Sequence, residues 1–195
     1  SAASDVYKRQ IVEESKRLKA ISGKLMELVS SGDSELELNP VRTDVILNEL
    51  SIVFEPMMKA KSITLFTHIE PLIINADADL FKSVIYNFVD NAVKASFEGG
   101  KIELTCRSEG EYAVITVRDY GMGIAEEDKK RIFEPFYMAD KVRSRKLGGA
   151  GLGLALCAEI AKKHNAKIEL ESELGKGTII SICIKQSEGK INEQI

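Results

Sequence analysis

The chain has 195 residues, of which 44% are hydrophobic and 29% charged, and its formal net charge is −3 at pH 7. This profile indicates a soluble globular protein with one ordinary domain and a small extra element. The absence of a long basic block argues against nucleic acid as a main partner. No apolar run reaches the length of a membrane span, and no signal-peptide pattern opens the sequence. The three dispersed cysteines lack metal-ligand spacing, so we expect small buried thiols in a reducing compartment: Cys106, Cys157 and Cys183.

The start of the chain divides into three short segments. Residues 1–10, SAASDVYKRQ, resemble the in-frame translation of a sequencing adapter, so we expect them to be foreign to the gene. A genuine polar helix start is the alternative. From Ile11 to Leu28 the apolar residues follow a heptad spacing, which predicts a bundle-type helix within residues 11–34. Residues 30–34 are expected to form a linker.

The remaining residues, 35–186, predict one α/β domain, and residues 187–195 a polar tail. Helices are expected over 44–61, 77–96 and 151–164, with Thr43 or Asp44 as the first cap and Asp77 or Asp79 as the second. Strands are expected over 63–69, 72–75, 101–107, 112–118, 167–172 and 177–185. We expect the segment 72–75 to be the hairpin partner of 63–69. Strand pairs interspersed with three helices predict a two-layer α/β sandwich, a mixed sheet with helices on one face.

Four blocks of residues carry candidate chemistry, and the first lies on the second helix of this domain. Asn87, Asn91 and Lys94 are spaced i, i+4 and i+7, so they share one face of the helix. Amide oxygens are hard ligands of the kind that Mg²⁺ accepts, and lysine brings positive charge to a phosphate. The spacing indicates a metal–phosphate face, although a solvated polar stripe has the same pattern.

The second block is Asp119-Tyr120-Gly121-Met122-Gly123-Ile124, which follows a predicted strand. A carboxylate at a strand end can accept a hydrogen bond from an exocyclic amino group such as adenine N6. Gly121 and Gly123 let the chain turn tightly beside a base. An ordinary acidic turn is the alternative.

The last two blocks surround a basic loop. Phe133-Glu134-Pro135-Phe136-Tyr137 predicts a rigid turn packed against the body of the domain. Residues 138–147 carry Arg143 and three lysine or arginine neighbours, which fits a lid over phosphates or a solvated loop. The glycine run over 148–154 precedes the third helix, and its backbone amides suit a phosphate cradle.

In this order the four blocks resemble the N, G1, F and G2 boxes of the ATP-binding domain of sensor histidine kinases. That family belongs to the superfamily that includes gyrase, Hsp90 and MutL. The resemblance runs from about Pro40 to Lys185 and implies the Bergerat ATP-binding fold. The helix over 11–29 resembles the second helix of the family's dimerisation and phosphoacceptor bundle.

The resemblance implies a role for each matching position. Asp119 would bind the adenine amino group, Asn91 with Asn87 would hold Mg²⁺, and Lys94 would contact phosphate. The base pocket would be lined by Gly121 and Gly123. The lid would be hinged, and its amides presented to phosphate, by Gly149, Gly151, Leu152 and Gly153, and Arg143 would reach the γ-phosphate.

Two positions depart from the family pattern. Met138 stands where an arginine often follows the F box, which puts that phosphate contact in doubt. His164-Asn165-Ala166 stands where His-Gly-Gly is usual. His68 and His164 lie outside the bundle helix, so both are expected to be structural or surface residues.

In the family, the γ-phosphoryl group of ATP passes to a histidine on the first bundle helix and then to an aspartate of a response regulator. The resemblance therefore implies ATP and Mg²⁺ as cofactors, a response-regulator receiver domain as partner and a homodimer through the bundle. We expect a cytoplasmic domain of a membrane-anchored protein, with the phosphoacceptor histidine absent from this chain. The alternatives are a non-catalytic ATP-sensing module and a serine kinase of the anti-sigma type.

Overall fold

The computed structural model describes residues 15, 22, 36–139 and 151–187. The chain divides into two compact units, residues 1–37 and 38–195, and the helices and strands discussed below belong to the second. The helix expected over 11–29 falls almost wholly outside the described residues, so it stays a prediction. The proposed adapter origin of residues 1–10 is likewise untested.

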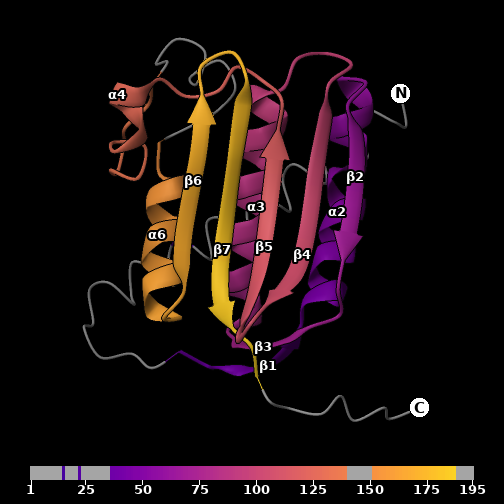
Figure 1. Cartoon of the computed structure of the whole chain (residues 1–195), viewed down its shortest axis with the longest axis vertical. Coiled ribbons are helices and arrows are strands. Elements are labelled where there is room, and N and C mark those ends of the chain that lie inside the picture. Colours follow the sequence, from indigo (N-terminus) through magenta and orange to yellow (C-terminus); the bar gives the residue numbers. More distant parts are fainter. Residues whose placement is uncertain (1–14, 16–21, 23–35, 140–150, 188–195) are drawn as a thin grey trace. The chain divides into compact units, whose positions relative to one another are not determined.

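One layer of the second unit is a five-stranded mixed sheet (Figure 1). Its order is β2 (Thr64–Ile69), β4 (Lys101–Glu109), β5 (Tyr112–Asp119), β7 (Gly177–Lys185) and β6 (Lys167–Glu173). β2 runs parallel to β4, and the other neighbouring strands are antiparallel. Alternate residues of the central strands are buried, as Ile102 and Leu104 of β4 illustrate, because successive side chains point to opposite faces.

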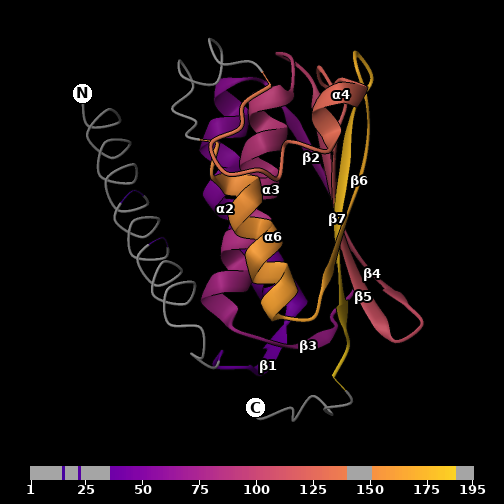
Figure 2. The ribbon, with the colours of Figure 1, turned by 90° about the vertical axis from the view of Figure 1, so that its left-hand side faces the viewer.

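The other layer consists of three helices on one face of the sheet (Figure 2): α2 (Thr43–Ala60), α3 (Ala78–Ala95) and α6 (Gly153–Lys163). α3 is central and packs on both other helices and on β5. Five of its inward side chains are at most 1% exposed: Leu80, Phe81, Val84, Ile85 and Phe88. Burying each of these side chains stabilises the fold by about 1.5–3 kcal/mol. The predicted two-layer sandwich with helices on one face is confirmed.

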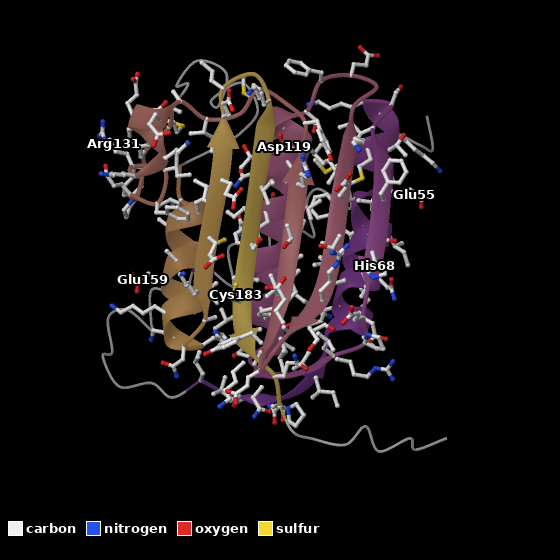
Figure 3. All side chains as sticks on the ribbon, viewed as in Figure 1. Glu55, His68, Asp119, Arg131, Glu159 and Cys183 are labelled. Atoms are coloured by element: carbon white, nitrogen blue, oxygen red, sulfur yellow. The ribbon has the colours of Figure 1, made fainter. Side chains whose placement is uncertain are left out.

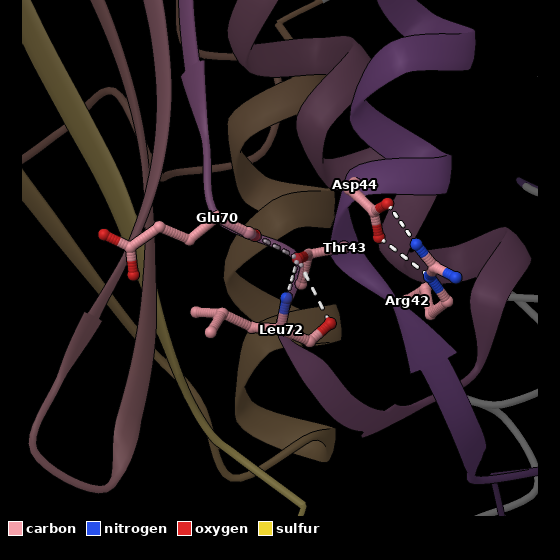
Figure 4. Close-up of polar contacts among 5 residues, drawn as sticks. All are labelled: Arg42, Thr43, Asp44, Glu70 and Leu72. Atoms are coloured by element: carbon pink, nitrogen blue, oxygen red, sulfur yellow. Dashed lines mark hydrogen bonds and ion pairs between the residues drawn. The ribbon is translucent and has the colours of Figure 1, made fainter. Parts of the chain in front are cut away.

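The predicted pairing of the segment 72–75 with β2 was wrong. β3 (Ile73–Ala76) instead pairs antiparallel with β1 (Asn39–Arg42), a strand not expected from the sequence, in a separate two-stranded sheet. Figure 4 shows how Thr43 holds the connection after β2: its hydroxyl donates to the Glu70 carbonyl oxygen and accepts from the Leu72 N–H, both at 3.1 Å. This connection leads β3 away from β2, and Pro71 within it has no N–H for a hairpin ladder.

The same contacts explain why the first predicted helix cap was wrong. The N-cap of α2 is Arg42, whose side chain makes no capping hydrogen bond, and the Thr43 hydroxyl is engaged with the β2–β3 connection. Asp44 lies in the first turn and forms an ion pair with Arg42 at 2.6 Å (Figure 4). The cap predicted for α3 is confirmed, because the Asp77 carboxylate accepts from the Leu80 N–H at 3.1 Å.

The two histidines occupy the kinds of position expected from the sequence. His164 is 7% exposed; its Nε2 accepts from the Asp77 N–H at 3.0 Å, and its Nδ1 lies 2.8 Å from the Ile160 carbonyl oxygen. It therefore fastens the end of α6 to the start of α3. His68 is exposed on β2 (Figure 3). Asn165 has a φ of +50°, which asparagine tolerates better than most residues, so the departure from His-Gly-Gly preserves the helix end.

The predicted burial of the cysteines holds for two of the three. Cys106 and Cys157 are buried, and burial raises the pKa of both thiols. Cys183 is only half-buried because its place in the alternation of β7 turns it to the face without helices.

The structure also contains a four-residue helix, α4 (Glu126–Lys129), which is too short to show a helical period in the sequence. Within the described part of the chain, no helix combines the length and apolar character that crossing a membrane requires.

Candidate functional site

Two candidate functional residues, Asp119 and Lys94, lie at one end of the sheet, where β5 and α3 both end. Asp119 is the last residue of β5 (Figure 3), and Lys94 lies in the last turn of α3. The Met122 N–H donates to the Ala95 carbonyl oxygen at 3.2 Å, which ties the loop after β5 to the end of α3. The loop of the second block thus meets the end of the helix that carries the first block, although Lys94 and Asp119 are 25 residues apart in sequence.

Asp119 is a buried hydrogen-bond acceptor. It is 5% exposed, and its Oδ1 accepts from the Gly121 N–H at 2.9 Å. Burial raises the pKa of the Asp119 carboxyl, and hydrogen bonds from the backbone of Gly121 and Thr178 oppose that rise. The side chain therefore has a fixed direction before any ligand arrives.

Gly121 and Gly123 are required by close backbone packing around this aspartate. A Cβ at Gly121 would lie 2.2 Å from the Ala95 carbonyl oxygen. A Cβ at Gly123, whose φ is +65°, would lie 1.9 Å from the Glu173 carbonyl oxygen. The loop after β5 is therefore pressed between the end of α3 and the β6–β7 turn.

Three residues beside Asp119 were not singled out from the sequence. Thr178 is its cross-strand neighbour on β7, and a Cβ at Gly177 would lie 2.2 Å from the Asp119 carbonyl oxygen. Ser172 of β6 accepts from the Ile124 N–H at 2.9 Å. The Gly175-Lys176-Gly177 segment marks a turn, but only the strand register places that turn next to a residue more than fifty positions earlier.

The polar face of α3 begins beside the first turn of α6. The Asn87 Nδ2 donates to the Ser83 carbonyl oxygen at 2.8 Å, and a Cβ at Gly153 would lie 2.6 Å from Asn87 Oδ1. Asn91, one turn later, is exposed. Lys94 Nζ lies 2.6 Å from Asp90 Oδ2, so the predicted phosphate-binding lysine forms an ion pair on its own helix.

The F-box turn contacts the described end of the glycine run. The Phe136 N–H donates to the Gly151 carbonyl oxygen at 2.8 Å, and a Cβ at Gly151, where φ is +68°, would lie 2.7 Å from the Tyr137 carbonyl oxygen. The Tyr137 hydroxyl donates to Asp128, and the Arg131 guanidinium lies 4.2 Å from the centroid of the Tyr137 ring. The turn is packed as predicted, although the Phe136 side chain itself is 72% exposed.

Leu152 is the N-cap of α6 and is 40% exposed. Arg143 and Gly149 lie outside the described residues, so their predicted roles rest on the sequence alone. Contacts link several of the described candidate residues to neighbouring segments of the site. Gly121 meets the end of α3, Asn87 on α3 meets Gly153, and Gly151 meets the F-box turn.

Residues 76–188 match the family described as histidine kinase-, DNA gyrase B- and HSP90-like ATPases. The chain belongs to this family. Sensor-like histidine kinase SenX3 of Mycolicibacterium smegmatis is 33% identical over 183 residues, which are 92% of this chain but 48% of SenX3. This chain thus spans less than half the length of that relative.

Solved histidine kinases share the fold of this ATPase-family chain. The catalytic domain of ThkA superposes with a TM-score of 0.69 and 28% identity, covering 77% of this chain and 97% of that domain. ThkA in complex with the response regulator TrrA gives a TM-score of 0.68 at 27% identity, over 91% of this chain and 49% of that one. Full-length ShkA in complex with AMPPNP gives 0.74 at 25% identity, over 97% of this chain and 40% of that one. The described unit is an ATP-binding catalytic domain of the sensor histidine kinase type.

Proposed function

We propose that this domain holds Mg·ATP between α3, the loop after β5 and the start of α6, and directs the γ-phosphoryl group to a histidine of the upstream bundle. From there the phosphoryl group passes to an aspartate of a response regulator. The main support is the meeting of α3 and β5: the helix that carries Asn87, Asn91 and Lys94 ends against the loop that begins with Asp119.

Asp119 is proposed to bind the base. Its carboxylate is an acceptor with a fixed direction, which suits the exocyclic amino group of adenine. Gly121 and Gly123 allow the loop to pass close to the end of α3, and we propose that the same loop lines the base pocket.

Asn91 and Asn87 are proposed to hold Mg²⁺. Both present amide oxygens from one face of α3, and Mg²⁺ takes six oxygen ligands, so phosphate oxygens and water would complete its shell. The donor set fits a metal that arrives with a triphosphate. When bound, Mg²⁺ would neutralise charge on the phosphates, and Lys94 and Arg143 would add positive charge beside them. Gly149, Gly151, Leu152 and Gly153 would offer backbone amides.

Phosphoryl transfer depends chiefly on positioning and charge neutralisation, so the domain itself need not supply a nucleophile. The ThkA–TrrA complex supports a receiver domain as the partner, and the ShkA complex with AMPPNP supports nucleotide binding. We also propose that the whole protein forms a homodimer through a four-helix bundle. The domain would lie in the cytoplasm, and the whole protein would have a membrane anchor.

The test is transfer of radiolabel from [γ-³²P]ATP to the protein encoded by the complete gene. We expect an acid-labile phosphohistidine that Asn91→Ala abolishes, whereas Asn75→Ala, at an exposed asparagine of β3, leaves the label unchanged. Acid-stable phosphoserine would instead identify a serine kinase. ATP binding without any label would identify a nucleotide-sensing module.

A further inference from the structure

Ser172 joins three segments near Asp119 through one hydroxyl group. Its Oγ accepts from the Ile124 N–H at 2.9 Å and donates to the Gly177 carbonyl oxygen at 2.9 Å. The Thr178 Oγ1 lies 2.9 Å from the same oxygen. The hydroxyl thus connects the loop after β5 with both residues that begin β7.

Counting protons gives the direction of the contact between the two hydroxyls. A serine hydroxyl has one proton and two lone pairs. The proton of Ser172 is used at Gly177, and one lone pair receives the Ile124 N–H. The remaining lone pair faces Thr178, so the threonine is the donor in the contact between the two side chains.

The strand register places this hydroxyl pair next to Asp119. Asp119 pairs with Thr178, and Thr178 pairs with Ser172, so the three residues form one row across β5, β7 and β6. Side chains directly opposite each other on one face have Cβ atoms about 4.5–5.5 Å apart. Because the Thr178 proton is turned toward Ser172, the lone pairs of its Oγ1 are left as acceptors beside the carboxylate.

We propose that Ser172 is a positioning residue that sets the base preference of this site. The proposal rests on the base-binding role proposed for Asp119. Ser172 fixes Thr178 as an acceptor and anchors Ile124, so the Asp119 carboxylate and the Thr178 hydroxyl both offer acceptors. A 6-amino group is a donor and matches these acceptors, whereas a 6-oxo group is an acceptor and is rejected.

Removing the Ser172 hydroxyl changes the choice of base more than it changes the fold. In Ser172→Ala the Thr178 hydroxyl can rotate and donate to a 6-oxo group, and the Ile124 N–H loses its acceptor. We expect ATP to bind about three- to tenfold more weakly while ITP, its 6-oxo counterpart, binds about as before. The ATP-to-ITP preference therefore falls by that factor.

The experiment is calorimetric titration of the chain with ATP and with ITP in the presence of Mg²⁺. Thr178→Val should reduce the preference as Ser172→Ala does, and the double variant should add little, because both changes remove one coupled unit. Ser172→Thr keeps a hydroxyl at this position, so its ATP-to-ITP preference should stay within about twofold of that of the unmodified chain. The matched control is Ser181→Ala, which breaks a Ser181–Thr116 hydroxyl contact of 2.8 Å in the same sheet, away from Asp119.

Asp119→Asn in the same titrations separates the two proposals. If Asp119→Asn weakens ATP binding and Ser172→Ala leaves the ATP-to-ITP preference unchanged, the role of Ser172 is overturned and that of Asp119 stands. Equal weakening of ATP and ITP by Ser172→Ala would likewise reduce Ser172 to a structural role. If Asp119→Asn also has no effect, or the unmodified chain binds neither nucleotide, the base site and the inference built on it both fail.

Discussion

The two ends of the proposed nucleotide site are built differently. Around Asp119, backbone atoms of α3, β6 and β7 approach so closely that Gly121, Gly123 and Gly177 admit no side chain. On α3, the proposed metal and phosphate ligands are side chains at or near the surface: Asn91 is exposed, and Lys94 is paired with Asp90.

We call the surroundings of Asp119 the base end and the polar face of α3 the phosphate end. In the proposed site, the first recognises the base and the second binds the phosphates and the metal. The base end is set by folding, because its acceptor and its backbone are held before any ligand binds. The phosphate end depends on side chains that must exchange partners, since Lys94 has to leave or share Asp90 to reach a phosphate. We therefore expect substitutions at the base end to affect stability and binding together, and those at the phosphate end to affect binding alone.

The largest effect is expected from Gly123→Ala. The added Cβ would meet the Glu173 carbonyl oxygen at 1.9 Å, and φ is +65°. The loop must move, so ATP binding should be lost in calorimetry and urea denaturation should show a loss of more than about 3 kcal/mol in the free energy of unfolding.

Gly110→Ala is the matched control, because Gly110 has a φ of +61° and nothing within 4 Å of the added Cβ. In this variant only the positive φ lowers the free energy of unfolding, by about 1–2 kcal/mol, and ATP binding should be unchanged. If Gly123→Ala behaves like Gly110→Ala, the base end is not fixed by packing and the contrast between the two ends disappears.

How far this site could be predicted from sequence follows the same division. Asn87, Asn91 and Lys94 share a face because helical spacing alone dictates it, and Asp119 ends a strand whose alternation is visible in the sequence. Ser172 and Thr178 had no such local signal. Their proximity to Asp119 comes from pairing between β5, β7 and β6, which no short-range pattern encodes.

In the fold, too, local features could be predicted from the sequence, whereas long-range pairing could not. Helix and strand boundaries fell within one or two residues of their predicted positions, because burial on one face imposes a clear period. The pairing of β3 was wrong because it depends on Thr43, whose hydroxyl bonds with Glu70 and Leu72 across almost thirty residues. Long-range hydrogen bonds of this kind leave no periodic trace.

Asp119→Asn is expected to have the next largest effect on binding and the opposite effect on stability. Replacing a charged acceptor by a neutral amide weakens the free energy of ATP binding by about 1.5–3 kcal/mol, which lowers the ATP affinity by about 10- to 100-fold. Burial raises the pKa of the Asp119 carboxyl, so the folded state favours the protonated carboxyl. The stability that this preference contributes is fully present below the unfolded-state pKa, and it is lost as the pH rises through the folded-state pKa.

The asparagine variant should therefore be more stable than the unmodified chain at pH 7, and the two should converge as the pH falls toward about 4. Urea denaturation across that range measures the difference. Lower stability of Asp119→Asn at neutral pH would mean that the ionised carboxylate stabilises the loop, and binding and stability would then change in the same direction at this residue.

The smallest effect is expected from Asp90→Asn, which tests whether the phosphate end must exchange partners. The Lys94–Asp90 pair is partly exposed, with side chains 30% and 16% accessible, so releasing Lys94 should tighten ATP binding by no more than about threefold. Glu49→Gln makes the same change in net charge at an exposed α2 residue paired with Lys82, and should leave the affinity unchanged. Weaker binding in Asp90→Asn would show that Asp90 orients Lys94 for phosphate, and the phosphate end would then be as preformed as the base end.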